Sequence, residues 1–353
     1  MSRFFTSRLS KLVPYVPGEQ PQDRKYLKLN TNESPFPPAP EVLRAVEEEK
    51  RLQLYSDPES LTLRRTIAAR YGLTPERVMV TNGSDEALTF AFMAFGDDSA
   101  PLFFPDITYG FYPVLAELLR VPYRTLPLDG DFRIRPEDYY DLKGTVIIAN
   151  PNAPTGVALD LREIEGILRH NRDNVVLVDE AYIDFGGESA LPLLEKYDNL
   201  LIVQTFSKSR SMAGARLGFA MGSEDLIRDL KTIQYSTNPY NVNRMTSAAG
   251  VAAIEARAYY DECCAKIRRN RAWTKERLEA LGFTVLPSST NFLFARSDRI
   301  GGEALYLAMK ERGILIRHFT AERIKDYNRI TIGTAEQMEA FLAAVRACLE
   351  ETV

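Results

Sequence analysis

Apolar and polar positions follow two alternating patterns between residues 60 and 225. Helical stretches are separated by short runs of β-branched and other apolar residues, and continuous apolar runs of this length between helices are typical of buried parallel strands. The expected helices lie at 61–71, 84–95, 110–120 and 160–170. The expected strands lie at 78–80, 102–104, 146–148, 175–178 and 201–203. This order predicts an α/β fold in which helices cover both faces of a mostly parallel sheet.

The pattern changes after Pro239. A long helical region over 242–281 is followed by strands at 291–296, 314–317 and 329–332, which alternate with helices at 302–312 and 335–349. We interpret this part as a smaller α+β domain. The first residues are rich in proline and glycine, which suggests an arm that lies over another part of the chain. We therefore expect an arm, a large α/β domain and a small α+β domain at residues 1–30, 31–245 and 246–353.

The composition is that of an ordinary globular protein with more than one domain. The chain has 353 residues, of which 45% are apolar and 26% charged, so it can bury a full core. Its 44 basic and 48 acidic residues give a formal net charge of −4. A mildly acidic chain lacks the electrostatic pattern that binds nucleic acid or an anionic membrane surface. We expect small-molecule partners, with neither nucleic acid nor membrane among them.

Cysteine and histidine usage excludes several other classes. The cysteines are three in number, and Cys263 and Cys264 are adjacent, so a disulfide framework is not expected and a reducing cytosol fits best. The two histidines are far apart in sequence, which argues against a metal site. The N-terminus lacks the apolar core of a signal peptide, and the most apolar stretch, 87–95, is about half as long as a spanning helix requires. We expect a cytoplasmic protein without a bound metal.

Polar side chains follow two of the predicted strands directly. Asp179 and Tyr182 come after the run 175–178, and Lys208 comes soon after the run 201–203. Ligands of open α/β sheets lie beyond the carboxyl ends of the strands, so these side chains are expected to converge. Taken alone, an aspartate placed like Asp179 is more often a helix cap or a turn residue, and a lysine placed like Lys208 is more often a surface residue. Together they suit pyridoxal phosphate, which requires a lysine amine for the Schiff base, a carboxylate for the pyridine nitrogen and a phenol for O3′.

A phosphate group requires a separate anion site. Ser84 and Asp85 follow the run 78–80 and open a helix, whose N-terminal N–H groups bind anions well. An ordinary capping box is the alternative interpretation of this segment. Arg216 and the hydroxyl of Ser207 could complete the site. Tyr109 could stack on a ring, although a core aromatic residue is the simpler interpretation.

The set of motifs resembles the fold-type I pyridoxal-phosphate aminotransferases, and within them the histidinol-phosphate branch. The resemblance covers almost the whole chain. The matching segments are 12–15, 29–35, 55–58, 82–86, 150–156, 178–182, 207–208 with Arg216, and 329–333. It implies a mostly parallel sheet of the seven-stranded type in the large domain, and pyridoxal 5′-phosphate as the cofactor.

The resemblance also implies roles for individual residues. Lys208 is expected to form the Schiff base and to move the substrate proton, with Asp179 on the pyridine nitrogen and Tyr182 on O3′. The other expected cofactor contacts are Gly83, Ser84, Asp85, Tyr109, Asn152, Thr205, Ser207 and Arg216. Tyr55 resembles the tyrosine that reaches the cofactor phosphate of the neighbouring subunit, which implies a homodimer with shared active sites. Arg329 is expected to bind the substrate α-carboxylate, with Tyr15, Asn32 and Arg317 around the rest of the substrate.

One departure concerns O3′ of the cofactor. The family usually has asparagine directly before the Pro-Thr-Gly segment, and here that position is Ala153, with Asn152 one residue earlier. Either Asn152 takes over the contact, or Tyr182 makes it alone.

The implied reaction transfers an amino group between L-histidinol phosphate and 2-oxoglutarate in two half-reactions, as in histidine biosynthesis. Three alternatives stay open from the sequence: a threonine-phosphate decarboxylase, an aromatic-amino-acid aminotransferase, and a regulator that uses the same fold to bind ligands. The regulator is disfavoured because only about 30 residues precede the core and they carry no helix-turn-helix signal.

Overall fold

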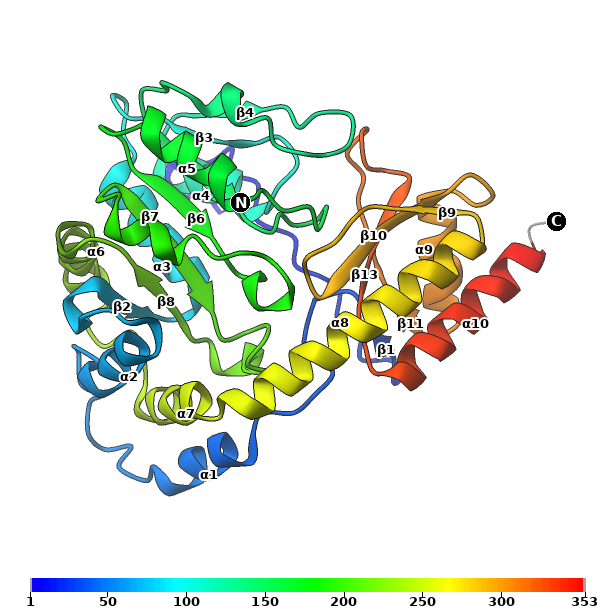
Figure 1. Cartoon of the computed structure of the whole chain (residues 1–353), viewed down its shortest axis with the longest axis horizontal. Helices are drawn as coiled ribbons and strands as arrows, with labels where there is room; N and C mark the ends of the chain where they lie inside the picture. Colours follow the sequence, from blue (N-terminus) through cyan, green and yellow to red (C-terminus); the bar gives the residue numbers. More distant parts are fainter. Residues whose placement is uncertain (1, 352–353) are drawn as a thin grey trace.

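A seven-stranded sheet forms the centre of the larger part of the molecule (Figure 1). The computed structural model describes residues 2–351. The strand order is β2-β8-β7-β6-β5-β3-β4, and all neighbours are parallel except β8, which runs antiparallel to both β2 and β7. The strands are β2 (Val78–Thr81), β3 (Leu102–Pro105), β4 (Tyr123–Leu126), β5 (Thr145–Ala149), β6 (Val176–Asp179), β7 (Leu200–Thr205) and β8 (Gly218–Met221). The predicted α/β fold with a mostly parallel sheet is confirmed.

Helices cover both faces of this sheet, which explains the continuous apolar runs. Successive residues of a strand point to opposite faces, and Val146 and Ile148 pack into one core while Ile147 packs into another. The first core includes residues of α2 and α7, and the second includes residues of α3 and α4. The helices of this part are α1 (Pro40–Glu48), α2 (Leu61–Tyr71), α3 (Gly83–Phe95), α4 (Phe111–Leu119), α5 (Leu161–His170), α6 (Glu224–Thr237) and α7 (Arg244–Glu255).

A second, antiparallel sheet forms the smaller part, with strand order β12-β13-β10-β9. Its strands are β9 (Phe283–Val285), β10 (Phe292–Ser297), β12 (Arg317–His318) and β13 (Tyr327–Thr331), and its helices are α8 (Arg257–Ala280), α9 (Gly302–Glu311) and α10 (Ala335–Glu351). The predicted helical region over 242–281 is two helices, α7 and α8, which meet at Ala256. In Figure 1, α8 runs from the seven-stranded part to the small sheet.

The N-terminal segment is tied to the smaller part. Strand β1 (Leu27–Lys28) pairs in parallel with β11 (Ile314–Leu315), so the chain enters the molecule beside the small sheet. Short 3-10 helices complete the structure: η1 (Ser7–Leu9), η2 (Pro75–Arg77), η3 (Pro136–Tyr139), η4 (Ile183–Phe185), η5 (Leu191–Glu195) and η6 (Ala213–Ala215). Over residues 2–351, none of the helices combines the length and the apolar character needed to cross a membrane.

Candidate active site

A cavity of about 420 Å³ receives residues from the ends of β6 and β7, from the start of α3 and from the small sheet. All but three of the predicted site residues line it. They are Tyr15, Asn32, Ser84, Asp85, Tyr109, Asp179, Tyr182, Thr205, Ser207, Lys208, Arg216, Arg317 and Arg329. The cavity therefore lies at the carboxyl ends of β6 and β7, where ligands of α/β sheets are expected.

Lys208, Asp179 and Tyr182 converge in the cavity, as predicted. The Lys208 Nζ donates a hydrogen bond to the carbonyl oxygen of Thr31 at 3.3 Å and lies 5.6 Å from the centre of the Tyr182 ring. The Tyr182 hydroxyl accepts a hydrogen bond from the Asn32 side-chain amide at 2.9 Å, so its own hydrogen is available to a ligand. These contacts give the amine, the carboxylate and the phenol that the predicted cofactor requires.

Asp179 is the last residue of β6, and only 5% of it is exposed. Burial raises the pKa of its carboxyl group to about 6, because the charged form loses its hydration. A hydrogen bond from the Tyr112 hydroxyl to Oδ2, at 2.8 Å, acts in the opposite direction. Tyr112 was missed by the sequence analysis. Tyr109 lies before α4 and Tyr112 lies in its first turn, so helical periodicity does not relate the two, and the sequence carried no clear signal for Tyr112.

The predicted anion site is assembled from the start of α3, the loop after β7 and the segment before β8. Gly83 has a φ of +73°, and a Cβ atom at this position would lie 2.6 Å from Nη2 of Arg216. Arg216 donates to Asp85 Oδ2 at 3.0 Å and lies 3.5 Å from the Ser207 hydroxyl. A guanidinium group, a hydroxyl group and the N–H groups of a helix N-terminus form a suitable donor set for a phosphate.

Two further arginines line the cavity from the small sheet. Arg317 and Arg329 are directly opposite each other on the antiparallel strands β12 and β13. Arg317 donates to the carbonyl oxygens of Val16 and Pro17 in the arm, at 3.1 and 3.2 Å. Burial lowers the pKa of Arg329, and the charge of Arg317 adds to this effect. Like charges in opposed positions destabilise a sheet, so this pair indicates a site for an anion.

Arg329 has hydrogen-bonding capacity to spare. Its Nη2 donates to the carbonyl oxygen of Asn30 at 2.9 Å, whereas its Nε is buried and has no hydrogen-bond partner within residues 2–351. Buried donors normally have partners, and an unused one in a cavity fits a ligand oxygen. The arrangement suits the predicted contact with a carboxylate.

Three of the predicted site residues do not line the cavity. Gly83 lies behind it and makes room for Arg216. The Asn152 side-chain amide donates to the Ile107 carbonyl oxygen at 2.9 Å and to the Thr155 hydroxyl at 3.0 Å. Both of its N–H donors are therefore used within the protein, while Ala153 lines the cavity instead. This geometry favours the second alternative for O3′, in which Tyr182 makes the contact alone.

Tyr55 is the third. Its side chain is 79% exposed and its ring stacks on that of Tyr240, with 4.5 Å between the ring centres. It lies on the surface, where it is free to contact another molecule.

A buried polar network links the segment of Lys208 to the segment of Asp179. The Glu180 carboxylate accepts a hydrogen bond from Gln204 at 2.8 Å, and Gln204 accepts one from Tyr71 at 2.8 Å. The Tyr71 hydroxyl in turn accepts one from Arg210, which forms an ion pair with Asp184 at 3.3 Å. The network joins the residue after Asp179 to the residue two after Lys208, so it fixes the two strand ends relative to each other.

Comparison with known proteins identifies the family. The profile of the aminotransferase class I and II family matches residues 24–345. The chain belongs to this family. It is 50% identical over 351 residues to the histidinol-phosphate aminotransferase of Marinomonas sp. (strain MWYL1). That alignment covers 98% of this chain and 99% of the relative. It is 47% identical over 349 residues to the histidinol-phosphate aminotransferase of Brachyspira hyodysenteriae, with 98% and 99% covered.

Solved structures of the family share the fold. The histidinol-phosphate aminotransferase of Sinorhizobium meliloti, solved in complex with pyridoxal-5′-phosphate, superposes with a TM-score of 0.89 over 100% of this chain and 99% of that one, at 24% identity. The L-threonine-O-3-phosphate decarboxylase of Porphyromonas gingivalis superposes with a TM-score of 0.80 over 92% and 99%, at 23% identity. The family membership and the fold type predicted from the sequence are confirmed.

Proposed function

We propose that this aminotransferase uses pyridoxal 5′-phosphate to transfer an amino group between L-histidinol phosphate and 2-oxoglutarate. The observation that supports this substrate is the opposed pair of Arg317 and Arg329 in the same cavity as Lys208. One arginine suffices for a carboxylate, whereas two suit a phosphate with its higher charge. The names of relatives at 47–50% identity support the same choice.

The residues of the cavity fit the cofactor. When bound, pyridoxal phosphate supplies the carbonyl carbon for the amine and an electron-withdrawing ring. Arg216, Ser207 and the N-terminus of α3 would hold its phosphate, and Asp179 would face its ring nitrogen. Tyr182 would donate its hydroxyl hydrogen to O3′, because its oxygen already accepts from Asn32.

Lys208 has two tasks in this proposal. Its amine would hold the cofactor, and its Nζ would take the proton from the substrate α-carbon. Arg329 would bind the α-carboxylate of glutamate in one half-reaction, and Arg329 with Arg317 would bind the phosphate of the second substrate in the other. Tyr15 and Asn32 would lie around the remainder of the substrate.

The visible spectrum tests this assignment. The purified protein with pyridoxal phosphate is expected to show a cofactor band that glutamate bleaches, that L-histidinol phosphate also bleaches, and that Lys208→Ala abolishes. A protein that never acquires the band contradicts the cofactor. Arg296→Gln, which removes a partly exposed arginine on β10 of the small sheet, outside the cavity, is the control and is expected to behave as the unaltered protein.

The related decarboxylase fold provides the second candidate, because O-phosphothreonine also combines an amine, a carboxylate and a phosphate. Carbon dioxide release from O-phosphothreonine, without a response to L-histidinol phosphate, would assign the protein to that reaction. Bleaching by unphosphorylated aromatic amino acids at equal rates would instead indicate an aromatic-amino-acid aminotransferase.

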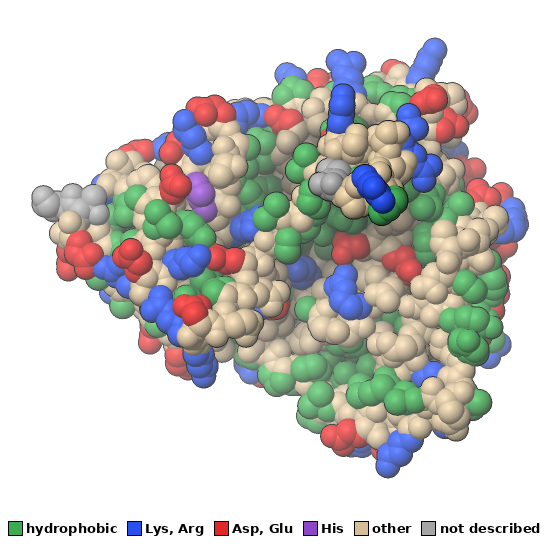
Figure 2. Space-filling model, turned by 180° about the vertical axis from the view of Figure 1, so that it is seen from behind, with side chains coloured by type: hydrophobic (Ala, Val, Ile, Leu, Met, Phe, Trp, Pro, Cys, Tyr) green, Lys and Arg blue, Asp and Glu red, His purple; other side chains and the backbone are tan. Residues whose placement is uncertain are grey.

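We also infer a homodimer in which Tyr55 reaches the phosphate site of the partner subunit. Leu52, Leu54 and Tyr55 are exposed by 69%, 54% and 79%, on the segment that follows α1. Figure 2 shows hydrophobic side chains gathered at the lower right of the molecule, the side on which α1 lies in the reversed view. Such a patch on a soluble protein is typical of an interface.

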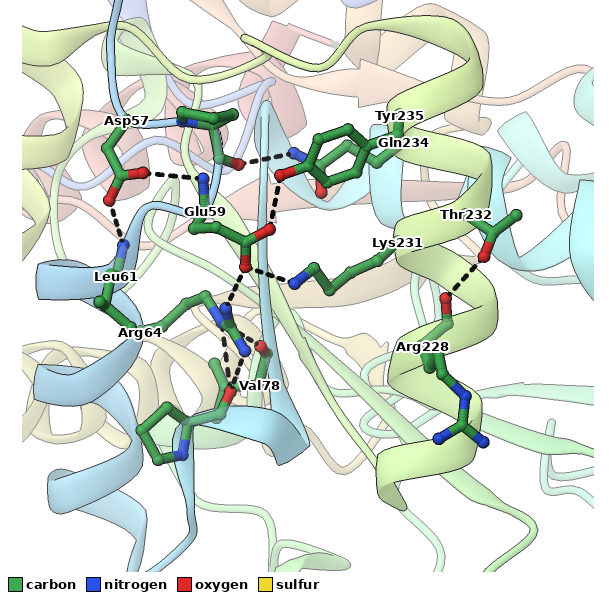
Figure 3. Close-up of polar contacts among 12 residues, drawn as sticks. Asp57, Glu59, Leu61, Arg64, Val78, Arg228, Lys231, Thr232, Gln234 and Tyr235 are labelled. Carbon is green, nitrogen blue, oxygen red and sulfur yellow. Dashed lines mark hydrogen bonds and ion pairs between the residues drawn. The ribbon is translucent and has the colours of Figure 1, made fainter.

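The base of this exposed segment is rigid. The Glu59 carboxylate accepts a hydrogen bond from Arg64 at 2.8 Å and further hydrogen bonds from Lys231 and Tyr235 on α6 (Figure 3). A segment fixed in this way can present Tyr55 to a second copy with little loss of conformational entropy on binding.

Sedimentation velocity tests the homodimer. The unaltered protein is expected to sediment with twice the mass of one chain, and Leu54→Glu is expected to sediment as a monomer with weakened cofactor binding. Leu307→Glu, at a leucine of α9 that is 49% exposed, is the control and is expected to remain a dimer. A monomeric unaltered protein that binds the cofactor fully would contradict the shared site.

We also propose that the protein works in a reducing compartment such as the cytoplasm, and its cysteines support this. Cys263 and Cys264 are adjacent and buried, and within residues 2–351 neither of the two forms a disulfide. Thiols of this kind are typical of intracellular enzymes.

A further inference from the structure

A tyrosine outside the cavity is bonded to the carboxylate that the mechanism requires to be charged. Tyr112 lies in α4, is fully buried and does not line the cavity. Its hydroxyl donates to Asp179 Oδ2 at 2.8 Å, while Oδ1 receives only a longer bond, 3.2 Å, from the backbone N–H of Ala181. The hydrogen bond from the Tyr112 hydroxyl is therefore the shorter of the two that the carboxylate accepts.

The Tyr112 ring is fixed by its neighbours. It makes edge or tilted contacts with the rings of Phe92, Phe104 and Tyr109, at centroid distances of 6.2, 5.8 and 5.5 Å. Aromatic contacts of this geometry hold a ring in place. The hydroxyl consequently has a defined direction, which is toward Asp179.

A buried hydroxyl does not need such a partner in this protein. Tyr139 is also buried, 2% exposed, and its hydroxyl has no hydrogen-bond partner in the described part of the chain. Among the described residues, the two buried tyrosines therefore differ in that the hydroxyl of Tyr112 has a carboxylate as its partner. Tyr139 also provides a matched control, because it offers the same chemical change at a buried site.

The charges around Asp179 show what the bond does. Burial disfavours the ionised carboxylate, and the nearby negative charge of Asp85, on α3, does so as well. Lys208 and the Tyr112 hydroxyl favour the ionised form. Lys208 would be engaged by the cofactor and the substrate, whereas Tyr112 lies outside the cavity and stays in place.

We propose that Tyr112 is a positioning residue that keeps Asp179 ionised and aimed into the cavity, so that Asp179 can hold the proton on the ring nitrogen of the cofactor. This rests on the proposed function, since it assumes that pyridoxal phosphate binds with its nitrogen at Asp179. Tyr112 touches neither cofactor nor substrate and acts only through the carboxylate. Nothing in the reaction requires its own proton to move.

The test compares Tyr112→Phe with the unaltered protein in the binding of pyridoxal phosphate between pH 5.5 and 8.5. Without the hydroxyl, Asp179 accepts a proton at a higher pH, so the acid limit of cofactor binding is expected to move upward. The affinity is expected to fall about tenfold near pH 6, the size of one hydrogen bond to a charged group, and to change little at pH 8.5. Tyr139→Phe is expected to leave the whole profile unchanged.

A second readout follows the ring nitrogen directly. With ¹⁵N-labelled pyridoxal phosphate, the nitrogen resonance of the unaltered holoprotein is expected to be that of a protonated ring from pH 6 to 8.5. In Tyr112→Phe the protonated fraction is expected to fall, and in Asp179→Asn the further change Tyr112→Phe is expected to have no effect. This dependence on Asp179 distinguishes the proposal from a general loss of packing.

Three outcomes would overturn the proposal: an unchanged pH profile in Tyr112→Phe, an equal shift in Tyr139→Phe, or an unprotonated nitrogen in the unaltered holoprotein. The last measurement needs no variant, so it remains decisive if Tyr112→Phe does not fold. Failure of the proposed function is recognised separately, because a protein that binds no pyridoxal phosphate at any pH contradicts the cofactor assignment itself.

Discussion

Replacement of Arg329 by glutamine is expected to damage the glutamate half-reaction strongly and the fold not at all. The guanidinium group is enclosed in the cavity, its Nε has no partner within residues 2–351, and its pKa is lowered by burial and by Arg317 opposite. In the free protein this cation is stabilised by the Asn30 carbonyl oxygen and by the rings of Phe292 and Phe319, and a bound anion would stabilise it further.

The magnitude follows from this burial. Removal of one partner from a buried charge pair costs about 3–5 kcal/mol, which corresponds to a fall in kcat/KM of roughly 100- to 5,000-fold. The unfolding temperature of the ligand-free protein is expected to stay the same or to rise, because a desolvated cation next to a like charge is lost. Arg317→Gln is expected to affect L-histidinol phosphate more than glutamate, since its role is to add a second cation for the phosphate.

Stopped-flow absorbance of the cofactor measures each half-reaction separately, with glutamate in one experiment and L-histidinol phosphate in the other. Arg296→Gln serves again as the control. If folded, cofactor-loaded Arg329→Gln loses less than tenfold with glutamate, the assignment of Arg329 to the carboxylate is wrong. If the unfolding temperature drops by many degrees, Arg329 has a structural role that its contacts do not reveal.

Three other predictions concern the cofactor site and stability. Gly83→Ala is expected to weaken pyridoxal phosphate binding at least tenfold in equilibrium dialysis, because a Cβ would lie 2.6 Å from Arg216 and the φ of +73° disfavours alanine; unchanged affinity would show that the segment adapts. Asp160→Ala removes the capping box that Asp160 forms with Glu163 and is expected to cost about 1 kcal/mol of unfolding free energy in urea, without loss of activity. Burial raises the pKa of Glu180 to about 7, above its ordinary value of 4.5. The protonated side chain therefore contributes stability that is fully present below pH 4.5 and is lost as the pH rises through 7. In urea titrations, Glu180→Gln is expected to flatten this fall of the unfolding free energy with pH.

The large sheet could be predicted because its central strands are buried on both faces. Strands β5, β6 and β7 are buried at every position, which produces the continuous apolar runs seen in the sequence. Strands β4 and β8 were not predicted, and only β4 lacks this signal, because β8 is also buried at every position. Strand β4 lies at the sheet edge with three exposed residues, and β8 is short and begins with a glycine.

The site was predictable where a residue follows a strand directly, and not where it depends on register or packing. Asp179 ends β6 and Lys208 comes three residues after the end of β7, so both are close to the first kind. The opposition of Arg317 and Arg329 depends on the register between β12 and β13, which a pattern of apolar residues does not specify for such short strands. Tyr112 belongs to the second kind, because in sequence it is one aromatic residue among many.

The opposed arginines have a consequence for how this protein could change over time. Lys208, Asp179 and Arg216 all belong to the seven-stranded part, whereas both arginines belong to the small sheet. Bond-making and the choice of molecule are thus encoded in separate stretches of the gene. Under the proposed function, changes at Arg317 on β12 would redirect the enzyme to a new amine while Arg329 and the reactive centre stay intact.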